Sequence, residues 1–520
     1  MNGADLLCET LLENDVNVCF ANPGTSEMHF VGALDRRLDM RCVLGLSETV
    51  VTGAADGYGR MAEKPAATLL HLGPGLANGL ANLHNAKRAA TPILNIVGDH
   101  AAYHLPYDAP LTSDIESFAR PVSGWVGRAE SADMIAVRTA EALTATRRGA
   151  EGQVSTLILP ADTAWSEVSR GTGSVRAQPV TNGIPSPDEI EAACKALRGS
   201  EPVLIILGGD ALKARHQSLA SIISQSTGAT LLTENASRRI ERGSGRVGLS
   251  RVPYPVDIAV ASLSNFKTVI LIGALEPVAF FAYPGKPSAL LPEGCVVVHA
   301  ATPADDAYLA LELIAEAVVP AHARPQPVLS EFHLPDAPRG RITAETLGAC
   351  VARDMPEGAI VCNEAITGGE PFSRYSLNAR PHDVLGLTGG AIGCGIPLAT
   401  GASMACPARK VITLQADGSG MYSLQGLWTQ ARERLDVVTV ILANRRYAIL
   451  RAELANVGAG TAGTNASRML DMTDPSPDWV QLSKGMGVDA VRVDSAEELS
   501  DAFSGAMKRS GPFLIEAVMD

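Results

Sequence analysis

The sequence predicts an α/β protein built from three doubly wound domains, each with a parallel sheet covered by helices. Short β-branched segments alternate with amphipathic stretches, and this pattern occurs three times along the 520 residues. Each apolar segment ends in Gly, Pro, Asn or Asp before the next helical pattern begins, as in βαβ units. Two Pro-rich stretches, near residues 176–189 and 319–340, separate the repeats and are expected to be linkers. The predicted domains are therefore 1–175, 188–320 and 340–520.

The expected strands are the most apolar segments of each domain. They fall at 16–20, 41–46, 67–72, 93–99 and 155–160 in the first domain, at 202–212, 230–236, 268–275 and 295–300 in the second, and at 359–365, 410–420, 437–450 and 512–518 in the third. In open α/β sheets, ligands bind beyond the carboxyl ends of the strands, so functional residues are expected in the loops that follow these segments. The sequence has neither a P-loop motif nor a GxGxxG motif after the first strand, which disfavours nucleotide-binding functions of those kinds.

Composition excludes several other classes of function. The net charge is −13, and no run of Lys and Arg exceeds two residues, so nucleic acid and anionic membrane surfaces are not expected partners. The longest apolar stretch, 268–283, contains Glu276 and is shorter than the ~20 residues of a membrane span. The first residues do not resemble a signal peptide, and the nine Cys include no CxxC pair. These features predict a soluble, cytoplasmic protein with reduced thiols.

Two neighbouring strands of the third domain end in residues that could bind a metal ion. One runs into Asp417, and the next ends at Asn444. Adjacent parallel strands would bring these side chains together, and carboxylate and amide oxygens suit octahedral Mg²⁺ when phosphate oxygens complete the set. The N–H groups of Gly418 and Ser419 could also face a phosphate. Taken singly, Asp417 is explained more simply as a helix cap and Asn444 as a turn residue.

This segment resembles the GDG…NN signature of thiamine diphosphate (ThDP) enzymes. Ala416 and Ala443 replace the first Gly and the first Asn of that signature, while the two metal-binding side chains are kept. The resemblance implies a Mg²⁺ site made by Asp417, Asn444 and the main-chain carbonyl of Arg446, and a diphosphate site that includes Gly418, Ser419, Tyr422 and Asn444.

Three segments of the first domain strengthen the resemblance. FANPGTSE (20–27), LGLSETVVTGAADGYGR (44–60) and LLHLGPGLANGLANLHNA (69–86) are similar, in order and spacing, to segments of the acetolactate synthase and benzoylformate decarboxylase group. Glu48 matches the glutamate that contacts the aminopyrimidine ring in these enzymes, where it promotes proton removal from the reactive carbon. Its apolar neighbours predict a buried carboxyl. The alternative is an acid that only stabilises a helix N-terminus.

A glycine-rich segment of the third domain, VLGLTGGAIGCGIPLATGA (384–402), is similar to the family's segment under the thiamine ring. The resemblance implies that the Gly390 carbonyl accepts a hydrogen bond from the exocyclic amino group. It also implies that Ile392 is the apolar wedge that forces the cofactor into a V shape. Because the motifs extend across the whole chain, a ThDP-enzyme fold is expected, with pyrimidine-binding, central and diphosphate-binding domains.

The resemblance leaves the substrate open. His71 and Thr25 fall on the active-site histidine and serine of benzoylformate decarboxylase, and Phe280 stands where that enzyme has a second histidine. Ile449 completes the expected pocket. Three more histidines, His29, His100 and His104, lie in loops near the same strand ends, and such residues are usually solvated.

The leading hypothesis is a ThDP- and Mg²⁺-dependent enzyme that decarboxylates a 2-oxo acid and joins the product to an aldehyde or a second 2-oxo acid, as acetolactate synthases do. One alternative is a benzoylformate-type decarboxylase that releases an aldehyde, and another is a non-catalytic binding or regulatory subunit. No motif decides whether FAD is bound. The resemblance also implies a homodimer or homotetramer, in which Glu48 of one copy faces the diphosphate-binding domain of another.

Overall fold

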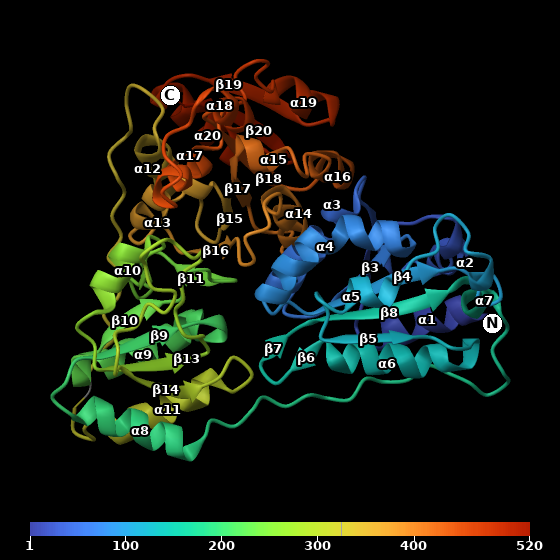
Figure 1. Cartoon of the computed structure of the whole chain (residues 1–520), viewed down its shortest axis with the longest axis horizontal. Coiled ribbons are helices and arrows are strands. Elements are labelled where there is room, and N and C mark those ends of the chain that lie inside the picture. Colours follow the sequence, from blue (N-terminus) through green and yellow to red (C-terminus); the bar gives the residue numbers. More distant parts are fainter. Residues whose placement is uncertain (324, 520) are drawn as a thin grey trace.

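The computed structural model describes residues 1–323 and 325–519, and within them the strands form three main sheets and one short hairpin. Figure 1 shows three lobes, one around each main sheet, arranged as a triangle. The irregular segment between the first and second lobes runs along one side of this triangle (Figure 1). Within the described ranges, no helix combines the length and the apolar character needed to cross a membrane.

The first lobe contains a parallel six-stranded sheet with the order β2-β1-β3-β4-β8-β5. Its strands are β1 (Val18–Asn22), β2 (Arg41–Leu44), β3 (Ala66–Leu70), β4 (Ile93–Asp99), β5 (Trp125–Arg128) and β8 (Val154–Pro160), beside the hairpin β6 (Arg147–Arg148) and β7 (Glu151–Gly152). Its helices are α1 (Gly3–Glu13), α2 (Met28–Asp35), α3 (Glu48–Ala62), α4 (Leu72–Arg88), α5 (Ile115–Ala119), α6 (Ile135–Ala145) and α7 (Ala161–Trp165). Strands β3, β4 and β8 are buried along their whole length, as expected for a sheet covered on both faces.

The second lobe is a smaller parallel sheet with the order β12-β10-β9-β13-β14. The strands are β9 (Val203–Leu207), β10 (Thr230–Thr233), β12 (Ser250–Arg251), β13 (Thr268–Ile272) and β14 (Val296–Ala301). The helices are α8 (Pro187–Arg198), α9 (Ala214–Thr227), α10 (Val256–Leu263) and α11 (Ala307–Val318). The lobe has its own apolar cores, one beneath α8, α9 and α11 and a second one beneath α10.

The third lobe contains a seven-stranded sheet with the order β11-β16-β15-β17-β18-β20-β19. Its strands are β11 (Ile240–Arg242), β15 (Ile360–Glu364), β16 (His382–Gly386), β17 (Val411–Ala416), β18 (Val437–Ala443), β19 (Asp489–Val493) and β20 (Phe513–Val518). Its helices are α12 (Ala344–Asp354), α13 (Glu370–Tyr375), α14 (Gly395–Ala405), α15 (Asp417–Gly420), α16 (Gly426–Glu433), α17 (Ala448–Asn456), α18 (Thr464–Leu470), α19 (Trp479–Gly485) and α20 (Ala496–Lys508).

The α/β class is confirmed, with one departure from three separate parallel sheets. Strand β11 belongs by sequence to the middle segment, yet it pairs with β16 of the third sheet in antiparallel register, with Ile240 opposite Val384. The middle segment therefore supplies an edge strand to the third lobe and fixes these two lobes to each other.

The first and third lobes share one apolar core because α3 crosses α14 at close range. A Cβ added at Gly57 would lie 1.9 Å from the carbonyl oxygen of Leu398, and one added at Gly401 would lie 1.8 Å from that of Ala54. Only glycine allows the two helix backbones to approach this closely.

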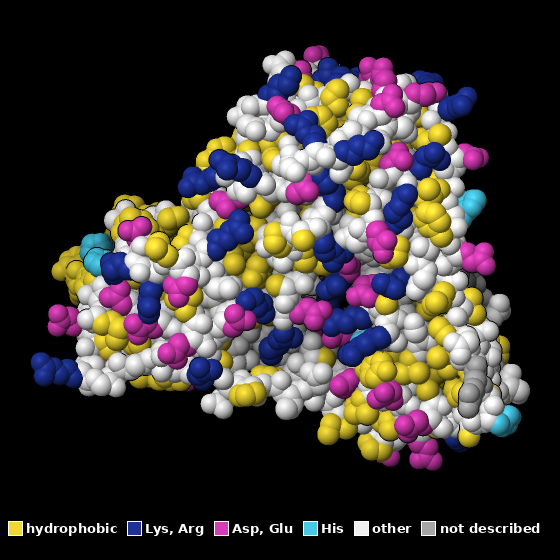
Figure 2. Space-filling view, turned by 180° about the vertical axis from the view of Figure 1, so that it is seen from behind, with side chains coloured by type: hydrophobic (Ala, Val, Ile, Leu, Met, Phe, Trp, Pro, Cys, Tyr) yellow, Lys and Arg dark blue, Asp and Glu magenta, His cyan; other side chains and the backbone are white. Residues whose placement is uncertain are grey.

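Charged side chains join all three lobes where they meet. Glu63, at the end of α3, pairs with Lys213 and Arg239 of the second lobe, and Arg239 also pairs with Asp383 of the third lobe at 2.8 Å. Figure 2 shows Lys, Arg, Asp and Glu side chains mixed around the hollow between the lobes. The network balances cations against anions and holds the lobes in one arrangement.

Candidate active site

The carboxyl ends of β17 and β18 lie side by side, because the two strands pair in parallel with Ala416 opposite Leu442. Asp417 follows β17 and is buried, with 2% of its surface exposed. One carboxylate oxygen accepts from the N–H of Gly418 at 2.8 Å, and the other accepts from the N–H of Arg445 at 2.5 Å. Asp417 thus ties the two strand ends together. Burial raises the pKa of its carboxyl, and these main-chain donors oppose that shift.

Asn444 follows β18 and lies in the turn that Asp417 holds. Its side-chain oxygen accepts from the N–H of Arg446 at 3.1 Å, and Arg445 between them has a left-handed φ of 55°. No cluster of three His, Cys, Asp and Glu side chains that could hold a metal occurs in the described part of the chain. A metal here would rest on the Asp417 carboxylate, the Asn444 amide and main-chain oxygen. These are hard ligands, so the donor set fits Mg²⁺ with phosphate oxygens.

The glycine-rich loop between β16 and α14 faces residues from two other segments. Gly390 has a φ of 75°, and a Cβ at this position would lie 2.7 Å from the ring of Phe280 in the second lobe. Gly393 lies in the same way against Tyr422, and Gly418 against the ring of Tyr447. At each of these points the missing Cβ lets a tyrosine or phenylalanine side chain pack directly on the backbone. Phe280 is thus placed beside the loop expected to bind the cofactor.

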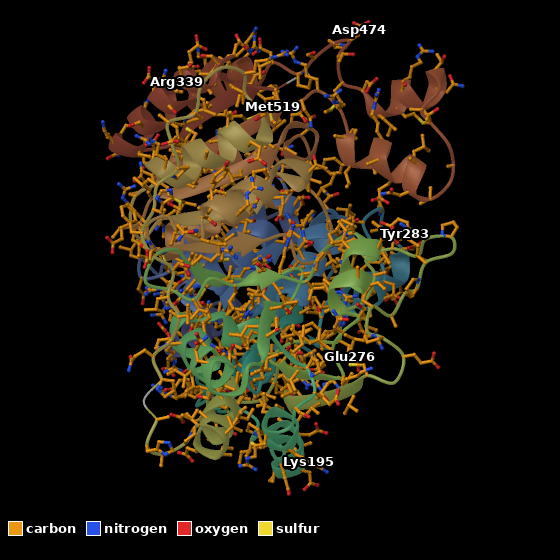
Figure 3. All side chains as sticks on the ribbon, turned by 90° about the vertical axis from the view of Figure 1, so that its left-hand side faces the viewer. Lys195, Glu276, Tyr283, Arg339, Asp474 and Met519 are labelled. Carbon is orange, nitrogen blue, oxygen red and sulfur yellow. The ribbon has the colours of Figure 1, made fainter. Side chains whose placement is uncertain are left out.

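The segment that carries Phe280 also contacts α17. The hydroxyl of Tyr283 hydrogen-bonds to Glu453 of α17, and Figure 3 shows Tyr283 on a loop at the edge of the molecule. Burial and this carboxylate raise the pKa of Tyr283. Ile449, on the first turn of α17, is half-buried. One side of the candidate site is therefore a contact between the second and third lobes.

Glu48 is the first residue of α3, after the cap Ser47, and its carboxylate accepts from the side-chain amide of Asn78 at 3.2 Å. A Cβ on Gly75 would lie 3.1 Å from the other carboxylate oxygen and 3.4 Å from the Cβ of His71, so this glycine separates the two functional side chains. The expected burial of Glu48 is wrong for the single chain, where the residue is half-exposed. Its position on the first turn of a helix at the end of the sheet leaves the carboxylate open on one side.

His71 follows β3 and is held by Glu27. Its Nδ1 lies 2.8 Å from Oε2 of Glu27, which also accepts from the N–H of Gly24 at 2.7 Å. The imidazole ring covers Gly24, where a Cβ would lie 2.3 Å from Nδ1. Glu27 is fully buried, and this burial raises the pKa of its carboxyl while Gly24 and His71 oppose the shift. The pairing uses Nδ1, so Nε2 is the ring nitrogen left for a substrate.

Thr25 borders a cavity of about 450 Å³ at the carboxyl end of the first sheet. Three histidines line this cavity together with Trp165: His29, His100 and His104. His100 and His104 lie after β4 as expected, whereas His29 lies on the first turn of α2 and not in a loop. The ring of His29 lies 5.5 Å from that of Trp165, and the rings of His100 and His104 are 5.2 Å apart. The three histidines are therefore grouped around one space beside Thr25.

The predicted site residues fall into two groups. Thr25, Glu48 and His71 lie on the first lobe, while the third lobe carries the metal-binding and diphosphate-binding candidates with Phe280 against its glycine-rich loop. Four further residues hold these groups and were not given roles from the sequence: Glu27, Asn78, Asn85 and Glu364. Glu27 is the last residue of the FANPGTSE segment, so its place in a motif shared with the family could have indicated a functional role.

In the third sheet, two parallel strands end in an Asp–Asn pair beside a glycine-rich loop. The first sheet leads into a helix that begins with a Glu. Together these features define a cofactor-binding α/β protein of the ThDP type. Two family models match the chain: the N-terminal TPP binding domain of thiamine pyrophosphate enzymes over residues 1–117, and the C-terminal TPP binding domain over residues 371–517. The chain belongs to the thiamine pyrophosphate enzyme family.

Individual relatives cover the whole chain. A Mycobacterium tuberculosis protein with the provisional name acetolactate synthase large subunit IlvX is 48% identical over 100% of this chain and 99% of its own length. Benzoylformate decarboxylase of Pseudomonas aeruginosa is 28% identical over 98% of this chain and 97% of its own length. The structure of a ThDP-dependent 4-hydroxybenzoylformate decarboxylase from Rhodococcus jostii RHA1 matches with a TM-score of 0.86 at 24% identity, covering 100% of this chain and 99% of that one. This last likeness establishes the fold.

Proposed function

We propose that this chain is a ThDP- and Mg²⁺-dependent enzyme that decarboxylates a 2-oxo acid and joins the remaining fragment to an acceptor carbonyl, as in acetolactate synthases. The observation that carries the proposal is the meeting of Asp417 and Asn444 at two paired strand ends, beside a loop with a left-handed Gly390. The 48% identical relative, named for an acetolactate synthase subunit, supports the same reaction class.

In this proposal the third lobe binds the metal and the diphosphate. Asp417 and Asn444 supply side-chain oxygens and Arg446 its main-chain oxygen to Mg²⁺. Gly418, Ser419 and Tyr422 would border the diphosphate. The Ser419 hydroxyl already donates to Ala416 and accepts from Gln415, so its contribution would come from the main chain.

The remaining residues orient the reacting groups. Bound ThDP would supply the electron sink that allows CO₂ to leave a 2-oxo acid. The Gly390 carbonyl would accept from the aminopyrimidine, Ile392 would support its bent shape, and the Glu48 carboxylate would contact its ring nitrogen. His71, held through Nδ1, would present Nε2 to hold or donate a proton at the substrate.

Release of an aldehyde is the second candidate reaction, and the pair of His71 and Glu27 favours it. A positioned imidazole at the end of β3 can return a proton to the decarboxylated product, which ends the reaction without an acceptor. Phe280 is an aromatic ring with no proton to give, so any such proton would come from His71. FAD has no part in either reaction as proposed.

The first experiment replaces Glu48 and measures turnover. In Glu48→Gln we expect turnover of a 2-oxo acid to fall by roughly 10²–10⁴-fold, the usual contribution of a positioned acid–base group. Binding of Mg²⁺ and ThDP, followed by calorimetry, should remain. Glu13→Gln, which changes an exposed glutamate of the same lobe, is the matched control and should keep full activity. Unaltered turnover in Glu48→Gln would refute the assigned role.

A panel of 2-oxo acids, given with and without aldehydes, separates the candidate reactions. CO₂ release with a carboligated product mass supports the proposal, while CO₂ release with a free aldehyde supports the second candidate. Wild-type protein that shows no Mg²⁺-dependent ThDP binding contradicts both and indicates a non-catalytic subunit.

A further inference from the structure

The loop of residues 387–394, between β16 and α14, carries Gly390 and Ile392. The inference made here rests on the proposed function, in which these two residues support the cofactor. The loop contains two glycines with left-handed φ, Gly390 at 75° and Gly393 at 94°. A segment with so much backbone freedom needs external contacts to keep one conformation.

Asn85, near the end of α4, holds the residue before Ile392. Its side-chain NH₂ group donates to the carbonyl of Ala391 at 2.7 Å, and its side-chain oxygen accepts from the N–H of Ala391 at 3.2 Å. Asn85 is fully buried, and its own carbonyl accepts from the Thr388 hydroxyl at 2.8 Å. A single amide therefore satisfies both main-chain groups of one loop residue, which fixes the orientation of that peptide.

Glu364, at the end of β15, holds the residue after Ile392. One carboxylate oxygen accepts from the N–H of Gly393 at 2.5 Å, and the other accepts from the N–H of Gly395 at the start of α14. The side chain is 1% exposed, and burial raises its pKa while these two N–H groups oppose the shift. A buried carboxylate must keep its hydrogen-bond donors, so Glu364 and the loop hold each other in place.

We propose that Asn85 and Glu364 are positioning residues, which hold the backbone on both sides of Ile392 so that its side chain can support the bent cofactor. Ala391 and Gly393, the two chain neighbours of Ile392, are fixed by side chains from two different lobes. The proposed function gives neither anchor a contact with the cofactor itself. A preformed loop removes part of the ordering entropy that binding would otherwise have to offset, so the anchors should strengthen ThDP binding.

The test uses two isosteric variants from different lobes, Asn85→Asp and Glu364→Gln. Asn85→Asp removes the NH₂ group that donates to the carbonyl of Ala391. Glu364→Gln replaces one accepting oxygen by an NH₂ group, so the N–H of either Gly393 or Gly395 would face a donor instead of an acceptor. We expect faster hydrogen exchange in the peptide that spans 387–394 of the apoprotein, with peptides from β17 unchanged. We also expect ThDP to bind about tenfold more weakly in each variant, as for the loss of roughly one hydrogen bond.

Asn265→Ala, at an exposed asparagine of the second lobe, is the control and should alter neither measurement. Unchanged loop exchange and ThDP affinity in both variants would overturn the proposal. Exchange that increases throughout the chain, together with a lower thermal midpoint, would also overturn it, because the residues would then serve general stability. If wild-type protein binds no ThDP, the proposed function fails, while loop exchange in the apoprotein still tests the anchors.

Discussion

Gly98, in the middle of the active-site edge of the first sheet, sets the position of the buried Glu27 carboxylate. A Cβ at this residue would lie 1.6 Å from Oε1 of Glu27, far inside van der Waals contact. That oxygen is buried and has no hydrogen-bond partner within the described residues, while Oε2 holds His71. Glu27 occupies the space that a side chain at position 98 would fill, so the orientation of His71 depends indirectly on Gly98.

Gly98→Ala is therefore expected to displace Glu27 and release His71. Overpacking of a buried site destabilises a protein by about 1–3 kcal/mol, which predicts a lower midpoint of thermal unfolding. The pH profile of turnover should also change, since Nδ1 of His71 would lose its partner. Gly32→Ala, where a Cβ would meet nothing closer than 3.7 Å, is the control. Equal midpoints and equal pH profiles for the two variants would show that the site accommodates a methyl group.

At the scale of secondary-structure elements, the crossing of α3 and α14 depends on glycine. Gly→Ala in an exposed helix usually stabilises it by roughly 1 kcal/mol. At the crossing of α3 and α14 the sign should reverse, because a Cβ on Gly57 or Gly401 would overlap a carbonyl oxygen of the other helix. We expect either substitution to destabilise the chain by about 1–3 kcal/mol, measured by denaturant unfolding.

Gly505→Ala, in α20, is the matched control for this prediction. A Cβ at Gly505 would meet nothing within 4 Å, so this variant should keep or slightly raise stability. If Gly57→Ala and Gly505→Ala behaved alike, the close crossing would not be a constraint on the structure.

Most strands inside the sheets could be predicted from the sequence, while several edge strands could not. The predicted segment at 93–99 coincides with β4, and the predicted segments at 410–420 and 437–450 contain β17 and β18 but extend beyond the ends of these strands. All three strands are buried on both faces and therefore strongly apolar. Strands β5, β11, β12 and β19 were not predicted, and each lies at the edge of its sheet. Strand β16, between β11 and β15, was not predicted either, because it runs directly into the glycine-rich segment. Edge strands are short and partly solvated, so WVGR and IER carry little of the apolar pattern that identifies a strand.

In the candidate site, contacts that follow from neighbouring strands could be predicted, whereas contacts between residues far apart in the chain could not. Asp417 and Asn444 could be placed together because adjacent parallel strands end at one edge, which is a local rule. The contacts of Asn85 with Ala391 and of Glu364 with Gly393 could not, because they join residues far apart in the chain with no motif of their own. The half-exposure of Glu48 could not be predicted either. Apolar neighbours in the sequence do not show whether this end of α3 is covered by the same chain or by a second copy.

At the scale of the whole molecule, the two groups of site residues belong to different lobes. Glu48 makes its hydrogen bond to Asn78 of the first lobe, and Asp417 makes its hydrogen bonds to main-chain groups of the third lobe. Large side chains near these groups are exposed in the single chain, among them Leu46 at 44%, Phe118 at 40% and Tyr422 at 56%. A second copy of the chain would cover such surfaces and would bring Glu48 to a neighbour's metal-binding residues, as in the homodimer or homotetramer that the sequence resemblance implies.

Mixed dimers test this arrangement directly. Glu48→Gln and Asp417→Asn should each be inactive alone, because every site of either homodimer lacks one essential group. In a heterodimer of the two, one site would combine both substitutions and the other would combine an intact Glu48 with an intact Asp417 from the other chain. Heterodimers isolated with two different affinity tags should therefore recover about half of the wild-type activity per dimer, as two-fold symmetry requires. If both residues acted within one chain, every site would lack one of them, and the heterodimer would stay as inactive as its parents.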